Sequence, residues 1–167
     1  MTASAGTAIC PGTYDPVTNG HLDIIGRAAR VFDRVVVGVV GNAPRKLDHM
    51  FTPEERKAFI EEALAANRIG NVEVAIFRNL LVEFAREHGA SAIVKGLRAI
   101  SDFEYEFEMN QLNRKLAPEI ESIYIIASPD YSFLSSTGVK EMAIFGGDVS
   151  DLVPPAVAAA LASRARR

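Results

Sequence analysis

Residues 12–21, Gly-Thr-Tyr-Asp-Pro-Val-Thr-Asn-Gly-His, combine residue types that suit the binding of a phosphate group. The first glycine lets the backbone come close to a ligand, and Asp15-Pro16 favours a turn. Thr18 or Asn19 can cap a helix that starts here, which places the His21 imidazole in the first helical turn. N–H groups at a helix start attract anions. The segment therefore predicts a turn that holds a phosphate beside a histidine.

The chemistry expected at this turn is charge neutralisation rather than covalent catalysis. Its spacing matches neither the P-loop pattern Gly-x-x-x-x-Gly-Lys-Ser/Thr nor the Gly-x-Gly-x-x-Gly of dinucleotide-binding folds. The sequence offers no Cys–His or Ser–His pattern that points to a covalent intermediate. A phosphate-group transfer needs its reactants aligned and their growing charge neutralised.

Short β-branched runs alternate with helical periodicity along the chain. Strands are predicted at residues 7–10, 34–40, 72–77, 92–94 and 123–127, and helices at about 22–32, 52–70, 80–88, 101–117, 136–145 and 154–165. Thr52-Pro53-Glu54-Glu55 and Ser101-Asp102-Phe103-Glu104 have the form of capping boxes. The alternation predicts an α/β fold class: one Rossmann-like domain over residues 1–167, with an about five-stranded parallel sheet and helices on both faces. The C-terminal helix is expected to pack on this domain.

Basic or hydroxyl side chains follow each predicted strand. Ligands of open parallel sheets bind outside the carboxyl ends of the strands. The junction after the first strand ends in His21, and the later junctions carry Arg45 and Lys46, Arg78 and Asn79, Lys95 and Arg98, and the hydroxyl-rich residues 128–137. We expect these groups to form one basic rim, for which a polyphosphate is the natural ligand.

Composition and charge exclude several other classes of protein. Of the 167 residues, 49% are hydrophobic and 23% are charged, which is typical of a globular domain. The net charge of −3 gives no general attraction to nucleic acid or anionic lipid. The single cysteine, Cys10, cannot form an internal disulfide and is interpreted as a small buried residue. With no signal peptide and no long apolar stretch, we expect a cytoplasmic protein that binds neither nucleic acid nor a membrane.

Four motifs in one order make a resemblance specific. Beside residues 12–21 they are Lys95-Gly96-Leu97-Arg98, Asp102-Phe103-Glu104-Tyr105-Glu106 and Tyr131-Ser132-Phe133-Leu134-Ser135-Ser136-Thr137. The first motif resembles that of the nucleotidyltransferase superfamily with a T/H-x-G-H signature. From about residue 7 to residue 161, the chain resembles the bacterial phosphopantetheine adenylyltransferases. That resemblance implies transfer of the adenylyl group of ATP to 4′-phosphopantetheine, with Mg²⁺ as cofactor, giving 3′-dephospho-coenzyme A and pyrophosphate in coenzyme A biosynthesis. It also implies a homohexamer, with coenzyme A as a candidate feedback ligand.

The resemblance further implies roles for individual residues. The implied catalytic residues are His21, which stabilises the transition state, Thr13, which orients the attacking phosphate, and Lys46 and Arg98. The implied ATP contacts are Thr13, Tyr14, His21, Gly96, Leu97, Arg98, Glu106, Tyr131, Ser132, Phe133, Leu134, Ser135, Ser136 and Thr137. The implied contacts of phosphopantetheine are Thr13, Lys46, Leu81 and Lys95. No side-chain ligand of Mg²⁺ is implied.

The chain departs from the family pattern at a few positions. Tyr14 replaces a frequent Phe, Lys95 a frequent Arg, and Thr137 the last Ser of a triplet. Asn79 stands where some members have Asp, so this chain lacks that carboxylate and any role it plays in those members. His49 and His88 belong to no motif and are expected to face solvent, whereas Phe103 and Phe107 suit the core or a subunit contact.

Two alternative functions stay open. A nicotinate-mononucleotide adenylyltransferase or a glycerol-phosphate cytidylyltransferase belongs to the same superfamily, but those enzymes usually have His where this chain has Thr18. A non-catalytic nucleotide-binding module is the alternative of a different class. Such a module would not need His21, Lys46 and Arg98 together.

Overall fold

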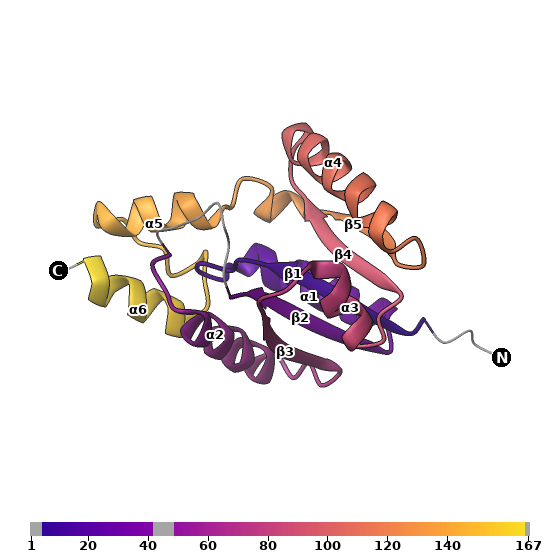
Figure 1. Cartoon of the computed structure of the whole chain (residues 1–167). Coiled ribbons are helices and arrows are strands. Elements are labelled where there is room, and N and C mark those ends of the chain that lie inside the picture. Colours follow the sequence, from indigo (N-terminus) through magenta and orange to yellow (C-terminus); the bar gives the residue numbers. More distant parts are fainter. Residues whose placement is uncertain (1–4, 42–48, 166–167) are drawn as a thin grey trace.

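Five parallel strands form one sheet in the computed structural model, which describes residues 5–41 and 49–165. The strands are β1 (Thr7–Gly12), β2 (Arg34–Val40), β3 (Val72–Phe77), β4 (Ala92–Leu97) and β5 (Glu121–Ile126). Their order across the sheet is β3-β2-β1-β4-β5 (Figure 1). Each neighbouring pair is parallel. The predicted Rossmann-like α/β fold is confirmed.

Helices cover both faces of the sheet. They are α1 (Asn19–Val31), α2 (Pro53–Ala66), α3 (Leu81–Glu87), α4 (Ile100–Leu116), α5 (Ser136–Ile144) and α6 (Pro155–Ala165), with a short 3₁₀ helix, η1 (Pro129–Tyr131), before α5. On one face, α1 and α2 pack against Val35 and Val37. On the other, α3 and the turn after α4 cover Val36 and its neighbours. Because both faces are covered, β2 is a nearly continuous apolar run rather than an alternating one.

The sheet is split between β1 and β4. β1 pairs with β2 along all of its length, from Thr7 to Gly12. With β4 it pairs only at Ala8↔Ala92 and Ile9↔Ile93. The strand order also reverses at this point, since the chain moves outward from β1 first in one direction and then in the other. Such a switch point is where ligands of open parallel sheets bind.

Several strand and helix boundaries differ from the prediction by a few residues, among them those of β1, β4 and α4. β1 continues through Pro11 to Gly12, and β4 continues through Lys95 and Gly96 to Leu97, since β4 pairs with β5 along this whole stretch. The predicted capping box at Ser101 is wrong. α4 starts at Ile100 after Ala99, without a side-chain cap. The Asp102 carboxylate, in the first turn of α4, accepts the Arg98 N–H.

The last helix packs on the domain as expected for residues 154–165. The Arg164 guanidinium lies 4.0 Å from the centre of the Phe51 ring. Its Nη2 donates to Glu55 Oε1 at 2.7 Å. Within residues 5–41 and 49–165, no helix is long and apolar enough to cross a membrane.

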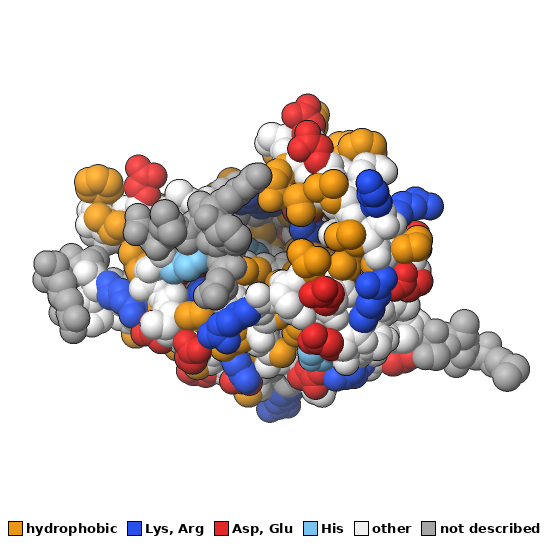
Figure 2. Space-filling model, in the orientation of Figure 1, with side chains coloured by type: hydrophobic (Ala, Val, Ile, Leu, Met, Phe, Trp, Pro, Cys, Tyr) orange, Lys and Arg blue, Asp and Glu red, His pale blue; other side chains and the backbone are white. Residues whose placement is uncertain are grey.

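Helix α4 carries apolar side chains that the chain itself leaves exposed. None of its residues is buried. Phe103, Phe107, Leu112 and Leu116 are each about half exposed. Figure 2 shows apolar side chains gathered over this helix. Phe103 and Phe107 therefore do not belong to the core of this chain, and their role in a subunit contact stays a prediction.

Candidate active site

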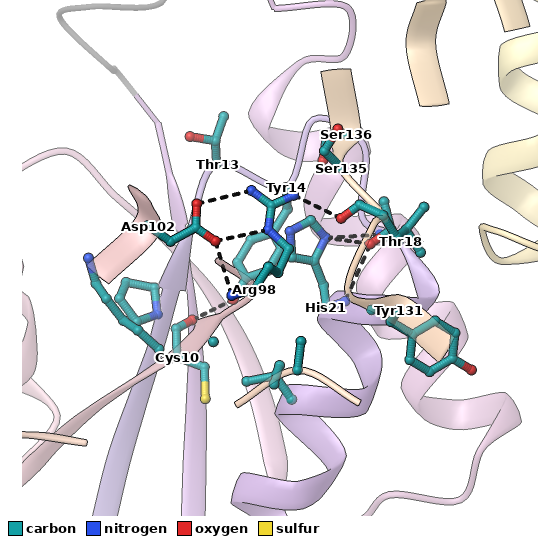
Figure 3. A pocket seen from close by; sticks show the side chains of 18 of the residues that line it. Cys10, Thr13, Tyr14, Thr18, His21, Arg98, Asp102, Tyr131, Ser135 and Ser136 are labelled. Carbon is teal, nitrogen blue, oxygen red and sulfur yellow. Dashed lines mark hydrogen bonds and ion pairs between the residues drawn. The ribbon is translucent and has the colours of Figure 1, made fainter. Parts of the chain in front are cut away.

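A cavity of about 910 Å³ opens at the carboxyl ends of β1 and β4, where the sheet is split. Its size suits a small-molecule ligand. The turn of residues 11–15, the start of α1, the end of β4, the start of α4 and the loop before α5 all contribute to its wall. Figure 3 shows Thr13, His21, Arg98 and Ser136, from these separate elements, around one space.

The turn that begins at Gly12 folds over its own tyrosine. Tyr14 has a φ of 52°, in the left-handed region that few bulky residues adopt. Its ring is buried, and its hydroxyl donates to the Cys10 carbonyl at 2.9 Å. A Cβ at Gly12 would lie 2.9 Å from this ring. Gly12 is therefore needed for packing within the turn, whereas the sequence suggested that it makes room for a ligand.

His21 is held at the start of α1 by reciprocal hydrogen bonds with the N-cap residue Thr18. The imidazole Nδ1 accepts the Thr18 N–H at 3.0 Å, and Thr18 Oγ1 accepts the His21 N–H at 3.3 Å. This is a capping box with histidine in the place of the usual Glu or Gln. A ring nitrogen that accepts carries no proton, so in the neutral ring Nε2 is the donor. The prediction that His21 lies in the first helical turn is confirmed, with Thr18 as the cap.

Asp15 anchors the turn to two distant parts of the chain. Its carboxylate accepts the N–H groups of Met50 and Phe51 at 3.0 and 2.9 Å. It also accepts a hydrogen bond from Lys140 Nζ, on α5, at 2.9 Å. Burial opposes ionisation, but these three hydrogen bonds outweigh it and hold the pKa of the Asp15 carboxyl below its ordinary value.

Arg98 is fixed by Asp102 and by the loop before α5. Its Nε donates to Asp102 Oδ2 at 3.2 Å, and its Nη1 donates to the Leu134 carbonyl at 2.9 Å. The Asp102 carboxylate also accepts the Arg98 backbone N–H at 3.0 Å. One aspartate therefore orients both the side chain and the main chain of Arg98 (Figure 3).

Lys95 and Glu106 form a second ion pair across the cavity wall. The distance between Lys95 Nζ and Glu106 Oε2 is 2.7 Å, and both side chains are about four-fifths buried. Gly96, the next residue, lies under α1, because a Cβ there would come within 2.9 Å of Ile24. Gly96 therefore allows α1 to pack closely against β4.

The predicted basic rim is only partly present. Within the described part of the chain, the three cations that line the cavity, Lys95, Arg98 and Lys140, are each paired with a carboxylate. Arg78 does not line the cavity and faces Glu54 at 3.6 Å. Lys46 lies outside the described residues. Among the described residues, the cations of the cavity wall are therefore members of oriented ion pairs.

Comparison with known proteins identifies the family. The cytidylyltransferase-like family model matches residues 9–142. A phosphopantetheine adenylyltransferase of Heliobacterium modesticaldum is 51% identical over 157 residues, covering 94% of this chain and 91% of that protein. One of Alkaliphilus metalliredigens is 51% identical over 156 residues, covering 93% and 97%. This chain belongs to the phosphopantetheine adenylyltransferase family. It is a nucleotidyltransferase.

A solved structure agrees on the fold of this family member. A putative nicotinate-nucleotide adenylyltransferase from Vibrio parahaemolyticus superposes with a TM-score of 0.71, covering 96% of this chain and 93% of that one. Its sequence is 18% identical, so the likeness concerns the fold alone.

Most of the site residues implied by membership of this family meet at the cavity. The cavity is lined by Thr13, Tyr14, His21, Lys95, Gly96, Arg98, Glu106, Tyr131, Leu134, Ser135, Ser136 and Thr137. Ser135 caps α5, and Ser136 Oγ donates to the Pro16 carbonyl at 2.7 Å, so these hydroxyls also hold the loop against the turn.

Four predicted contacts of this adenylyltransferase lie away from the cavity wall. Leu97 is buried, and Leu81, the first residue of α3, packs against the apolar cluster that contains Val36. Ser132 and Phe133 are exposed, and Phe133 keeps 72% of its surface open to solvent. Their assignment as ligand contacts stays a prediction.

Three residues at or beside the site were not predicted. Lys140 lines the cavity, and so does His49, whose Nδ1 lies 3.7 Å from Asp15 Oδ2. The expectation that His49 faces solvent is wrong, because its side chain is 17% exposed. Arg56 donates to the Thr13 carbonyl from α2. Lys140 stands three positions after Thr137, the last residue of the Ser-Ser-Thr motif, whereas His49 and Arg56 stand in no motif.

Proposed function

We propose that this cavity transfers the adenylyl group of ATP to 4′-phosphopantetheine, giving 3′-dephospho-coenzyme A and pyrophosphate in coenzyme A biosynthesis. Relatives named phosphopantetheine adenylyltransferase, at 51% identity, support the substrates. The observation that carries the assignment to this site is the capped His21, which lines the same cavity as Thr13 and Arg98.

The proposed reaction is one displacement at the α-phosphorus of ATP. An oxygen of the phosphopantetheine phosphate forms the new P–O bond while the bond to the β-phosphate bridging oxygen breaks, and pyrophosphate leaves. A phosphate monoester has a second pKa of about 6, so it is largely a dianion near neutral pH and needs no general base. The protein then contributes alignment and electrostatic stabilisation.

His21 is the proposed donor to the transferred phosphate. Because Thr18 occupies Nδ1, the donor of the neutral ring is Nε2. A donor held in place before the reaction costs no reorganisation when charge builds on the phosphate oxygens. Thr13, on the adjoining turn, would orient the attacking phosphate, and the turn is tied down through Asp15.

Arg98 is the proposed clamp on the ATP phosphates. A guanidinium carries five N–H donors. Of these, one on each of Nε, Nη1 and Nη2 points at Asp102 or Leu134 in the described structure. The second N–H on each Nη remains for a phosphate, so the Asp102 pair need not break. Tyr131 and the hydroxyls of residues 135–137 would complete the ATP contacts.

Lys95 and Lys46 are proposed for the acceptor phosphate. Lys95 meets the cavity from β4 with its charge shared with Glu106. The assignment of Lys46 rests on the resemblance alone, since this residue lies outside the described residues. Leu81 is proposed for the pantetheine arm on the same ground.

Mg²⁺ is proposed to enter as part of the MgATP substrate. Among the described residues, no cluster of His, Cys, Asp or Glu could hold a metal ion. The cavity carboxylates Asp15, Asp102 and Glu106 are each engaged by a cation. Mg²⁺ commonly keeps several waters and binds substrate phosphates. These side chains therefore do not fit a resident metal, and phosphate oxygens would carry the ion.

A pyrophosphate-release assay tests the function. ATP or CTP is offered with phosphopantetheine, nicotinate mononucleotide or glycerol phosphate, at one enzyme concentration. We expect release with ATP and phosphopantetheine and background release with the other pairs. Release only with nicotinate mononucleotide or glycerol phosphate would assign a sister activity. ATP binding without release from any pair would instead favour a non-catalytic module.

We also propose that the protein works as a homohexamer in the cytoplasm. The exposed apolar side chains of α4 support self-association, because a large apolar face on a soluble chain usually marks an interface. Light scattering of the wild type and of Phe107→Glu tests this assignment. A hexameric mass that falls in the variant supports it, and a monomeric wild type contradicts it. Coenzyme A is the proposed feedback ligand, to be tested by its inhibition of pyrophosphate release.

A further inference from the structure

Arg56 is a fully buried arginine that lies behind the cavity. Its relative exposure is 0%, and it is one of only three buried polar or charged residues in the described structure. Within residues 5–41 and 49–165 it forms no ion pair, and its Nη2 has no hydrogen-bond partner. Burial lowers the pKa of its guanidinium, which the charge of nearby Asp15 counteracts.

Backbone carbonyl groups take up the remaining donors of Arg56. Nη1 donates to the Thr13 carbonyl at 2.6 Å and to the Val40 carbonyl at 3.0 Å. Nε donates to the Phe51 carbonyl at 3.1 Å, with a longer contact to the carbonyl of Thr52 at 3.3 Å. One side chain therefore joins the turn, the end of β2 and the start of α2.

Burying the Arg56 guanidinium costs stability, which points to a role for the geometry of its hydrogen bonds. A buried charge is destabilising unless its hydrogen bonds are made, and an apolar side chain of similar volume often packs there at no loss of stability. The Thr13 carbonyl belongs to the same peptide group as the Tyr14 N–H, and Tyr14 has the strained φ of 52°. Strained backbone persists only where its surroundings hold it. Arg56 supplies that hold from one side of the turn, and Asp15 supplies it from the other.

We propose that Arg56 is a positioning residue for the transfer step. Its guanidinium holds the peptide group between Thr13 and Tyr14, so that Thr13 faces the reacting phosphates. The inference rests on the proposed function of the cavity. Arg56 does not line the cavity and touches no substrate in this account.

Two substitutions with a stability control test the proposal. Arg56→Met removes the donors and keeps an apolar chain, whereas Arg56→Lys keeps the charge but cannot reach all the carbonyls. At a temperature where circular dichroism shows a folded protein, we expect Arg56→Met to lower kcat roughly 10- to 100-fold. The Kd for ATP should change less than about threefold, and Arg56→Lys should recover part of kcat.

Leu64→Ala is the matched control, because Leu64 is buried on the same helix, two turns further along. We expect this variant to lose thermal stability but to keep kcat within about twofold, as cavity-forming changes act on stability. A similar loss of kcat in Leu64→Ala, or an unchanged kcat in folded Arg56→Met, would overturn the proposal. Should Arg56→Met fail to fold, the kcat of Arg56→Lys is compared with that of Leu64→Ala and interpreted by the same two criteria.

A spectroscopic readout separates this proposal from the proposed function. In ¹⁵N-labelled protein without substrates, the Tyr14 amide should shift in Arg56→Lys and stay in place in Leu64→Ala. If the wild type released no pyrophosphate with phosphopantetheine, the proposed function would fail while the amide shift could still be observed. An unmoved Tyr14 amide in Arg56→Lys contradicts the positioning role itself.

Discussion

The starts of α1 and α4 both deliver a side chain to the same cavity, but they are built differently. α1 begins with a side-chain capping box in which Thr18 is 1% exposed and His21 is itself a member. α4 begins without a side-chain cap, and the Arg98–Asp102 pair at its start is about a third exposed. α1 also buries Ile25 and Ala28 in the core, whereas no residue of α4 is buried.

The difference indicates that the two helix starts contribute to different steps at the site. The groups around His21 are held by buried contacts, which suits a donor that must be in position before charge develops. The groups around Arg98 are held by an ion pair that solvent reaches, and such pairs are worth only ~0.2–1 kcal/mol. We therefore expect changes on the α1 side to affect turnover and changes on the α4 side to affect substrate affinity.

Removing the His21 imidazole should have the largest effect. We expect His21→Ala to lower kcat by about 100-fold or more, because one oriented donor to the transition state is lost. The Kd for ATP should change far less. His21→Gln is the companion variant, since glutamine restores the capping box but not the ring donor. Steady-state kinetics and calorimetric titration with ATP measure both quantities, and a loss of ATP affinity at unchanged kcat would show that the assigned role is wrong.

Removing the Thr18 hydroxyl should have a smaller effect of the same kind. Thr18→Val keeps the shape and the backbone N–H that binds Nδ1, but it loses the oxygen that accepts the His21 N–H. We expect a loss of ~1 kcal/mol in the free energy of unfolding and a fall in kcat of roughly tenfold at most. Urea unfolding and saturation kinetics give the two values. An increase in KM for ATP with kcat unchanged would contradict the proposal that changes at the start of α1 affect turnover whereas changes at the start of α4 affect affinity.

Removing the Asp102 carboxylate tests the other helix start. Asp102→Ala removes a partner that holds the Arg98 guanidinium in place. Fixing that side chain against bound ATP then becomes less favourable. We expect KM for ATP to rise about two- to fivefold, as for a partly exposed ion pair, with kcat within about twofold. Arg27, whose Nη1 lies 3.2 Å from Asp23 on the surface of α1, provides a matched control in Arg27→Ala. A collapse of kcat in Asp102→Ala would place Arg98 in the transition state instead.

The acid stability of the turn should reflect Asp15. Its folded-state pKa lies below the ordinary value of 3.8, so its contribution to stability is complete above that value. The contribution is lost as the pH falls through the lower folded-state pKa. We therefore expect the melting temperature of the wild type to fall more steeply below about pH 4 than that of Asp15→Asn. Parallel slopes for the two proteins would show that the charge of Asp15 adds nothing to stability.

The sequence predicts most of the fold and the local parts of the site. β-Branched runs and helix signals place each strand and helix within a few residues, and Thr18 and His21 carry their capping signal three positions apart. The start of α4 was mispredicted, because the helix begins at Ile100, before the Ser101 that was expected to cap it.

What the sequence does not contain is the pairing of residues far apart along the chain. Asp15 and Lys140 are separated by 125 positions, and Arg56 and Thr13 by 43. No periodicity or spacing relates them, because the sheet brings them together only after all its strands are placed. For the same reason, the sequence did not predict that Lys95, Arg98 and Lys140 are each paired with a carboxylate. Cations can be read from sequence, but their carboxylate partners lie on other elements.

The split between β1 and β4 means that the protein obtains its cavity by leaving sheet hydrogen bonds unmade. Beyond Ile9 and Ile93 the two strands no longer pair, although each continues to pair with its outer neighbour. Pro11 has no N–H with which to extend the ladder towards β4. Backbone groups along this gap stay available to water or to a bound molecule. The ends of β1 and β4 both line the cavity. A bound substrate would therefore contact both halves of the sheet, so that catalysis and the connection between those halves would depend on the same stretch of backbone.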